Sequence, residues 1–208
     1  MKVLRIALVL VAATIGYPAL ASAATTDDCP YRPDYVALRS RVATTPPAAG
    51  VTALYRYAAD PENDNPAACE GIAIEQAIAG LELQLVRLVS GRRSLKPAAS
   101  YRCTAFDARS TACNGLVGDD TALPDPQGGP VERASTPLRA RVISNLPDAK
   151  LIALYSVPIG KLQDGVVATR LPPGPTLRLG KPASTIAVIA IFSAPQPWRY
   201  RKLVWYLR

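Results

Sequence analysis

Residues 186–192 read Ile-Ala-Val-Ile-Ala-Ile-Phe, a run that is apolar at every position. Its length suits a strand and falls far short of the about 20 residues that a membrane-spanning helix needs. Because the run is apolar on both faces of a pleated strand, we expect it to be covered above and below. It therefore predicts a central strand of the core, around which the rest of the chain is arranged.

Further strands are expected on either side of this run, because short apolar segments there are bounded by Pro, Gly or Asp. The strands expected are 138–142, 151–157, 165–171, 176–179, 185–193 and 199–207. Leu138-Arg-Ala-Arg-Val142 alternates apolar and basic residues, which is typical of a half-exposed strand, and Asn145–Asp148 reads as a turn. Residues 138–208 are thus predicted to form an antiparallel sheet or sandwich.

The last expected strand is basic and aromatic, and its alternation divides its residues between two faces. One face carries Arg199, Arg201, Leu203, Trp205 and Leu207, and the other carries Trp198, Tyr200, Lys202, Val204 and Tyr206. We expect the basic tips to lie near the start of the strand and the aromatic side chains to pack further in.

The preceding part of the chain is helical in pattern. Helices are expected over 33–42, over 51–58 and over 66–90, where a long apolar stripe ends at Gly91 as a C-cap. The long helix is a candidate cover for the central strand. We therefore expect an α+β protein with a helical, disulfide-bearing part at 24–122 and a β part at 138–208. Between them, 123–137 is rich in Pro and Gly and reads as a linker or as a long surface loop within one domain.

Residues 1–23 have the features of a cleavable signal peptide. Lys2 and Arg5 precede an apolar run that closes on Ala21-Ser-Ala23, a small-x-small cleavage site. An uncleaved anchor is the alternative, but Gly16 and Pro18 interrupt the run. A lipoprotein would place a cysteine at the cleavage point, and none stands there. The expected location is periplasmic or secreted.

The four cysteines, Cys29, Cys69, Cys103 and Cys113, form an even set behind this leader. Such a set indicates two disulfides formed in an oxidising compartment. Three pairings are possible; we favour Cys103–Cys113 across a short turn-like segment, which leaves Cys29–Cys69. A zinc site is the alternative, but it is disfavoured because the chain has no histidine and no Cys-x-x-Cys pair.

The absence of histidine also excludes most general-base catalysis and the Ser-His and Cys-His nucleophile pairs. Carboxylates remain: Glu70, Glu75 and Glu82 on the long helix, and Asp119-Asp120 in a loop. A pair of them could hydrolyse cell-wall glycans, while the alternative is that they are ordinary solvated acids. Asp119, Asp120 and Asp125 do not have the spacing of a calcium loop. We therefore expect no enzyme activity, no cofactor and no metal.

Charge is divided unevenly between the two halves. Residues 24–137 hold 11 Lys/Arg against 14 Asp/Glu, whereas residues 138–208 hold 11 against 2, a net charge of +9. The candidate binding residues for an anionic partner are Arg139, Arg141, Arg199, Arg201 and Lys202. They would suit an anionic envelope component, another envelope protein or a membrane surface, and not nucleic acid. The alternative is that this basic face packs against the acidic N-terminal half.

A family resemblance is carried by three segments: Leu171-Pro-Pro-Gly-Pro-Thr-Leu-Arg-Leu179, then Thr185–Phe192, then Trp198-Arg199. This order resembles the end of the small outer-membrane lipoproteins of type VI secretion systems. The resemblance implies a two-sheet sandwich and a scaffolding role in the envelope. It covers about 50 residues, and the chain departs from the family in its helical N-terminal half and in lacking the lipid-anchor cysteine.

The function expected from the sequence is a non-catalytic binding or interaction protein with a basic β face for an anionic envelope partner. Two alternatives are an accessory protein of an envelope secretion apparatus and a carboxylate-based hydrolase of cell-wall glycans. Two acids in a deep cleft would favour the hydrolase, and a flat or convex basic face would favour binding.

Overall fold

The computed structural model describes residues 30–63, 69–107, 113–114, 131–132, 138–159, 169–171, 176–179, 185–196 and 198–207. The residues described from Tyr31 onward belong to one compact unit. The expected signal peptide lies outside the described residues, as does the expected linker at 123–137 apart from one short strand. The fold below is that of the unit from Tyr31 onward.

Three helices open this unit: α1 (Pro33–Val42), α2 (Pro47–Ala58) and α3 (Cys69–Leu85). Both α1 and α2 begin with proline, which lacks the N–H that a first helical turn cannot satisfy. The helices share an apolar core with Tyr35 and Leu38 from α1, Val51, Leu54, Tyr55 and Ala58 from α2, and Ile74 and Ile78 from α3. Gly50 lets α2 lie close to both α1 and α3, because a Cβ at this position would be 3.2 Å from the side chains of Val42 in α1 and Leu81 in α3.

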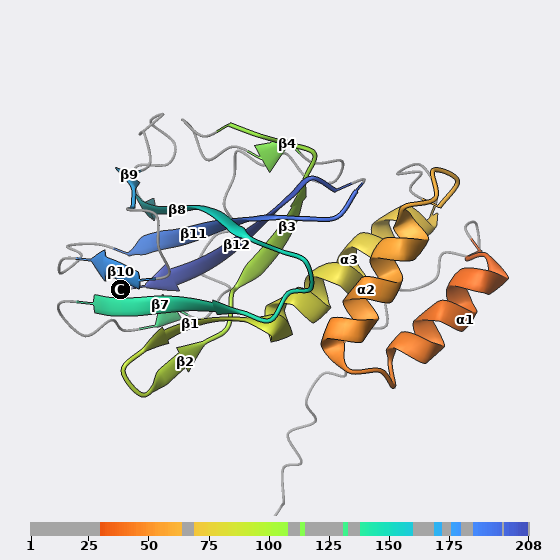
Figure 1. Ribbon diagram of the computed structural model, residues 1–208, viewed down its shortest axis with the longest axis horizontal. Helices are drawn as coiled ribbons and strands as arrows, with labels where there is room; N and C mark the ends of the chain where they lie inside the picture. The colour runs from red at the N-terminus through yellow and green to blue at the C-terminus, as the bar shows by residue number, and fades with distance from the viewer. Residues whose placement is uncertain are drawn as a thin grey trace, which may run out of the picture. The chain divides into compact units, whose positions relative to one another are not determined.

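The long helix expected over 66–90 ends earlier than the sequence suggested. It stops at Leu85, and the chain runs directly into strand β1 (Val86–Ser90), as Figure 1 shows. In β1, Val86 and Leu88 are buried while Arg87 and Val89 are less so, which is the period of a strand. Gly91 is not a helix cap; its φ of 56° opens a two-residue turn into β2 (Arg93–Leu95), as in a type II′ hairpin.

Two sheets account for most of the strands. The four-stranded sheet has the order β10 (Thr176–Leu179), β7 (Leu138–Ser144), β1, β2, and every pairing in it is antiparallel. The six-stranded sheet has the order β3 (Ala99–Cys103), β12 (Tyr200–Leu207), β11 (Ile186–Ser193), β8 (Leu151–Pro158), β9 (Thr169–Arg170), with β6 (Val131–Glu132) parallel to β12. A separate pair joins β4 (Ala105–Phe106) to β5 (Cys113–Asn114).

The predicted α+β class is confirmed, with three helices followed by antiparallel sheets. The helical part is shorter than the expected 24–122, because β1 to β5 already lie within that range. The reason is long-range pairing: β1 joins β7 in one sheet, and β3 joins β12 in the other. The segments before and after residue 123 are therefore interleaved in the same sheets.

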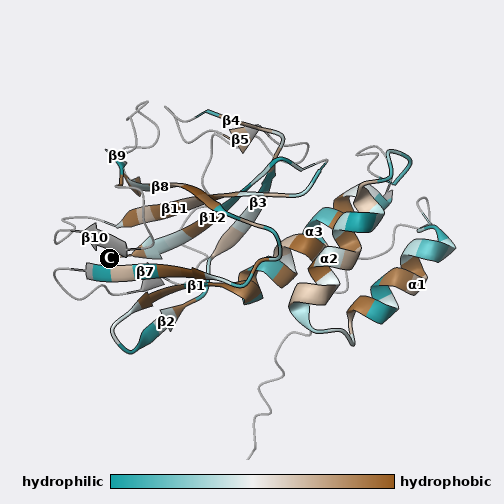
Figure 2. Ribbon diagram, in the orientation of Figure 1, coloured by the Kyte–Doolittle hydropathy of each residue, from teal (hydrophilic) through white to brown (hydrophobic). Residues whose placement is uncertain are grey.

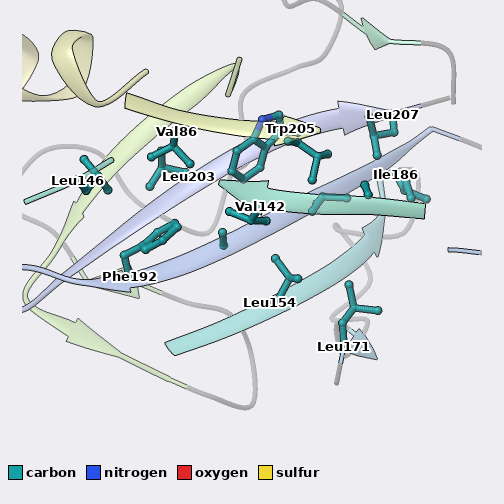
Figure 3. Close-up of a cluster of buried hydrophobic side chains, with 14 residues drawn as sticks. Val86, Val142, Leu146, Leu154, Leu171, Ile186, Phe192, Leu203, Trp205 and Leu207 are labelled. Carbon is teal, nitrogen blue, oxygen red and sulfur yellow. The ribbon is translucent and has the colours of Figure 1, made fainter. Parts of the chain in front are cut away.

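The core lies between the two sheets, which face each other across a cluster of buried apolar side chains. Figure 3 shows Val86 and Val142 of the four-stranded sheet opposite Leu154, Leu203 and Trp205 of the six-stranded sheet. The six-stranded sheet is apolar on its other face as well, where Ile189, Tyr155 and Tyr206 are buried and Phe106 packs against them. Figure 2 shows β8 and β11 as strongly hydrophobic strands.

The prediction for residues 186–192 is therefore confirmed. β11 lies between β12 and β8 in the middle of its sheet, and its residues from Ile186 to Phe192 are all buried. Within β12 the two expected faces are confirmed: Leu203, Trp205 and Leu207 enter the core between the sheets, while Val204 and Tyr206 enter the cluster on the opposite face. Trp198, expected on that second face, precedes the strand and packs in the core of the helices instead. The long helix was expected to cover the central strand, but α3 packs on α2, β3 and β1 rather than along β11.

Candidate functional site

The predicted basic residues fall into two groups. Arg139 and Arg141 on β7 are exposed, and so is Arg199, just before β12. By contrast, Arg201 and Lys202 are each only 2% exposed. The expectation that these two lie with the others on an accessible basic face is therefore wrong, and the candidate set for an external partner is reduced to Arg139, Arg141 and Arg199.

Arg201 is buried because an acid from the helical layer meets it. It forms an ion pair with Glu82 of α3, and both side chains are 2% exposed. Glu82 also accepts hydrogen bonds from the Tyr55 hydroxyl, at 3.0 Å, and from the Ser100 hydroxyl, at 2.6 Å. Within the described residues, Glu82 thus joins α2, α3, β3 and β12 through one carboxylate.

Aromatic rings complete the surroundings of this ion pair. The Arg201 guanidinium lies 4.5 Å from the centre of the Tyr55 ring and 5.8 Å from that of Trp198. Tyr55 and Trp198 meet edge to face at 5.4 Å. The guanidinium of Arg102, on the neighbouring strand β3, lies 4.6 Å from the centre of the Trp198 ring. Such stacking favours a cation that has been removed from water. We call Tyr55, Glu82, Ser100, Trp198 and Arg201 the Glu82 cluster.

The energetics of the Glu82 cluster follow from its burial. Removal from water raises the pKa of Glu82 well above its usual value and lowers the pKa of Arg201 well below its own. Each group is therefore costly to charge alone, and it is the partner that offsets this cost. A cluster of this kind fixes the helical layer on the sheet, and its inaccessibility makes it a structural element rather than a binding surface.

Lys202 has a comparable explanation on the opposite face of β12. Its ammonium lies 5.8 Å from the centre of the Tyr101 ring, on the neighbouring strand β3. The long aliphatic stem of lysine can be buried among apolar groups while the head meets an aromatic face. The residue therefore belongs to the packing of the six-stranded sheet.

The exposed basic surface lies on the outer face of the four-stranded sheet. In β7, Ala140 and Val142 are buried in the core, so the alternate residues Arg139 and Arg141 point away from it. In register, Arg141 is opposite Val89 of β1, and the neighbouring outward pair is Ile143 with Arg87. Arg87 is half-buried and donates to the carbonyls of Leu83 and Val86. We call the exposed pair Arg139 and Arg141 the β7 face.

No carboxylate among the described residues forms an ion pair with Arg139 or Arg141. The ion pairs found within the described ranges are those of Arg32 with Asp34 and of Arg201 with Glu82. The two β7 arginines thus present unneutralised guanidinium groups on a paired strand held by β1 on one side and β10 on the other. Arg199 lies immediately before β12 of the six-stranded sheet, and its backbone carbonyl accepts a hydrogen bond from the backbone N–H of Ala194.

The disulfide predicted between Cys103 and Cys113 is confirmed, with 4.9 Å between the two Cα atoms. It joins the end of β3 to the β4–β5 pair. The second predicted pair, Cys29–Cys69, lies outside the described residues: Cys29 precedes them, and Cys69 is described in its backbone only.

The acids considered for catalysis have other surroundings. Glu82 is buried in its cluster, and Glu70, 6% exposed, accepts a hydrogen bond from the backbone N–H of Arg32. Asp119, Asp120 and Asp125 lie outside the described residues. Across the described part of the chain, no three acidic, cysteine or histidine side chains gather in a way that could hold a metal ion.

Two hollows are lined by residues of the helical layer. A groove of about 540 Å³ runs between α1 and α2, and a pocket of about 230 Å³ lies between α2 and the turns that follow β7 and β11. Arg56 lines both of them. The pocket includes Tyr55 and Asp148, which adopts a φ of 53° in the β7–β8 turn.

Comparisons with known proteins return no match: no family model, no curated protein and no solved structure is similar to this chain. In the described residues, no helix is both long enough and apolar enough to cross a membrane.

Proposed function

We propose that this is a non-catalytic binding protein of the cell envelope, and that its β7 face binds an anionic envelope component. The observation that carries the proposal is the exposure of Arg139 and Arg141, without an ion pair to any described residue, on one face of a central strand. Charged groups that fold stability does not use are candidates for recognition. Because Arg201 and Lys202 are buried, the proposed binding surface is smaller than the one expected from the sequence.

The geometry suits phosphate or carboxylate groups. Residues two apart on a strand are separated by about 6.8 Å, so Arg139 and Arg141 can each contact a different anionic group or converge on one. Guanidinium groups bind such anions through paired hydrogen bonds. The strand is held by β1 and β10, so the spacing is fixed before the partner arrives.

The test compares two double variants of equal charge. Arg139→Gln with Arg141→Gln removes the β7 cations, whereas Arg39→Gln with Lys150→Gln removes two exposed cations elsewhere. Binding is measured to lipopolysaccharide and to phosphatidylglycerol vesicles, with phosphatidylcholine vesicles as the uncharged reference. We expect the β7 variant to lose at least tenfold in affinity and the control variant to change little. Binding should also weaken as the salt concentration rises from 50 to 300 mM, because the Debye screening length of exposed charges is only about 10 Å at 0.1 M ionic strength.

Equal losses in the two double variants would show that binding depends on net charge alone and would refute a specific β7 face. No binding of the unmodified protein to any of these probes, together with capture of one folded envelope protein that the β7 variant still binds, would favour the alternative role as an accessory protein of a secretion apparatus.

A further inference from the structure

The groove between α1 and α2 combines an apolar floor with two cations. Leu38 and Val42 of α1 and Ala53 of α2 line its floor, and Arg41 and Arg56 border it from the two helices. Both arginines are exposed. Its volume of about 540 Å³ is within the about 300–1,000 Å³ that is usual for small-molecule sites.

The charges of this groove do not cancel. Asp34 also lines it, but its carboxylate forms an ion pair with Arg32 at 3.2 Å. Neither Arg41 nor Arg56 forms an ion pair with any described residue. The Tyr57 hydroxyl is shielded from water at the same end as Asp34, and burial, with the nearby Asp34 carboxylate, raises the Tyr57 pKa to about 12. The groove therefore carries an excess of positive charge.

The direction of the two helices bears on how the two cations lie along the groove. Residues 43–46 connect α1 to α2 in a short turn, and Figure 1 shows the two helices running side by side. Long side chains on a helix lean toward its own N-terminus. Because the two helices are antiparallel, this preference would direct Arg41 and Arg56, which line the groove from opposite ends, toward each other.

We propose that this groove binds a single-chain amphiphile with an anionic headgroup, a carboxylate or a phosphate. The headgroup lies between Arg41 and Arg56, and the hydrocarbon chain lies on the apolar floor. Backbone groups of α1 and α2 are hydrogen-bonded within their helices, so the groove has no strand edge to which an extended peptide could add. Recognition rests on apolar contact and charge, which is the chemistry of an amphiphilic anion.

The experiment measures binding by calorimetry to four probes. Decanoate, decyl phosphate and decyl maltoside are each used below their critical micelle concentration, and acetate is the anion without a hydrocarbon chain. We expect decanoate or decyl phosphate to bind, whichever headgroup is preferred, and the neutral maltoside and the tail-less acetate to bind at least tenfold more weakly. Arg41→Gln should reduce the binding of the anionic probes at least tenfold. The matched control, Arg39→Gln on the same helix, should leave it unchanged.

Two further variants locate the ligand. Ala53→Phe fills the floor without changing the charge, and should abolish binding while far-ultraviolet circular dichroism stays the same. Arg56 borders the neighbouring pocket too, so a loss with Arg56→Gln but not with Arg41→Gln would place the ligand there and overturn the proposal. Equal binding of decyl maltoside, binding unaffected by Ala53→Phe, or no binding of either anion would overturn it as well.

Self-association is the remaining competing occupant. If sedimentation showed a dimer of the unmodified protein that Ala53→Phe dissociates, a second copy would occupy the groove, and the proposal would fail. All of these variants retain Arg139 and Arg141, so the outcome is independent of the function proposed for the β7 face.

Discussion

Strands β7 and β12 each carry two basic residues near their start, yet the two strands place these cations in opposite environments. On β7, Arg139 and Arg141 are exposed. On β12, Arg201 and Lys202 are 2% exposed. The local sequences predict the same element, and both do form strands. The difference arises from what covers each sheet: the four-stranded sheet packs in the core on one face, whereas the six-stranded sheet is buried on both.

The comparison shows that alternation reveals which residues share a face, but not what that face meets. Arg201 is on the same face as Leu203 and Trp205, which enter the core. A cation at that position needs an acid, and the acid comes from α3. Arg141 is on a face where no described acid lies close enough to pair with it. One arginine is therefore packed inside the fold against an acid, and the other is exposed.

The largest effect is expected from Glu82→Ala, which leaves Arg201 buried without its acid. Breaking a buried pair by removing one partner costs about 3–5 kcal/mol. Urea denaturation should show a loss of this size in the free energy of unfolding, a large part of the about 5–15 kcal/mol that a domain usually has. A loss below about 1 kcal/mol would contradict the structural role given to the Glu82 cluster.

A double variant separates the effect of the two charges from the effect of the volume that the two side chains fill. Replacing both charges, Glu82→Leu with Arg201→Met, removes the cost of burying ions, so the double variant should be more stable than either single variant. The measured coupling should exceed about 1 kcal/mol. Additive losses in the double variant would mean that the two residues act independently, and that the difference between β12 and β7 has another cause.

An intermediate effect is expected from the disulfide that borders β12. Cys103 pairs in register with Tyr200, next to the pair formed by Arg102 and Arg201. Replacing Cys103 and Cys113 by Ser opens a loop of 10 residues, for which chain entropy predicts a loss of about 3 kcal/mol. Urea denaturation of the variant, compared with the oxidised protein, checks this value. No change in stability would show that this bond does not hold β3 against β12.

The smallest effect on stability is expected from Arg139→Gln with Arg141→Gln. Exposed cations contribute under about 1 kcal/mol each, and these two form no ion pair with a described residue. Thermal unfolding should give nearly the same midpoint as for the unmodified protein. A drop comparable to that of Glu82→Ala would mean that the β7 arginines are structural, like Arg201.

Much of the fold could be predicted from short-range patterns. The apolar run at 186–192 identified the central strand because its composition excludes an exposed face, and the two faces of the last strand followed from alternation. The end of α3 could not be placed, because Val86–Ser90 is apolar enough for a helix and becomes a strand only through its pairing with β7. Tertiary contact decided that boundary.

The Glu82 cluster was missed, although one signal for it was present. Glu82 follows Ile78 by four residues and Leu81 by one, so it interrupts an apolar stripe at a position that faces the core. A carboxylate there requires a buried cation or hydroxyl. Its partners Tyr55, Ser100 and Arg201 are far apart in sequence, so their identity could not follow from spacing. For Arg139 and Arg141, alternation next to buried Ala140 and Val142 was sufficient.

The most direct test of the division between β7 and β12 is footprinting of the native protein with an arginine-specific reagent, read by mass spectrometry. In the free protein, Arg139, Arg141 and the reference residue Arg39 should react, and Arg201 should not. Adding lipopolysaccharide should protect Arg139 and Arg141 while Arg39 continues to react. Reaction of Arg201 in the native state, or equal reaction of Arg139 and Arg141 with and without lipopolysaccharide, would contradict the account.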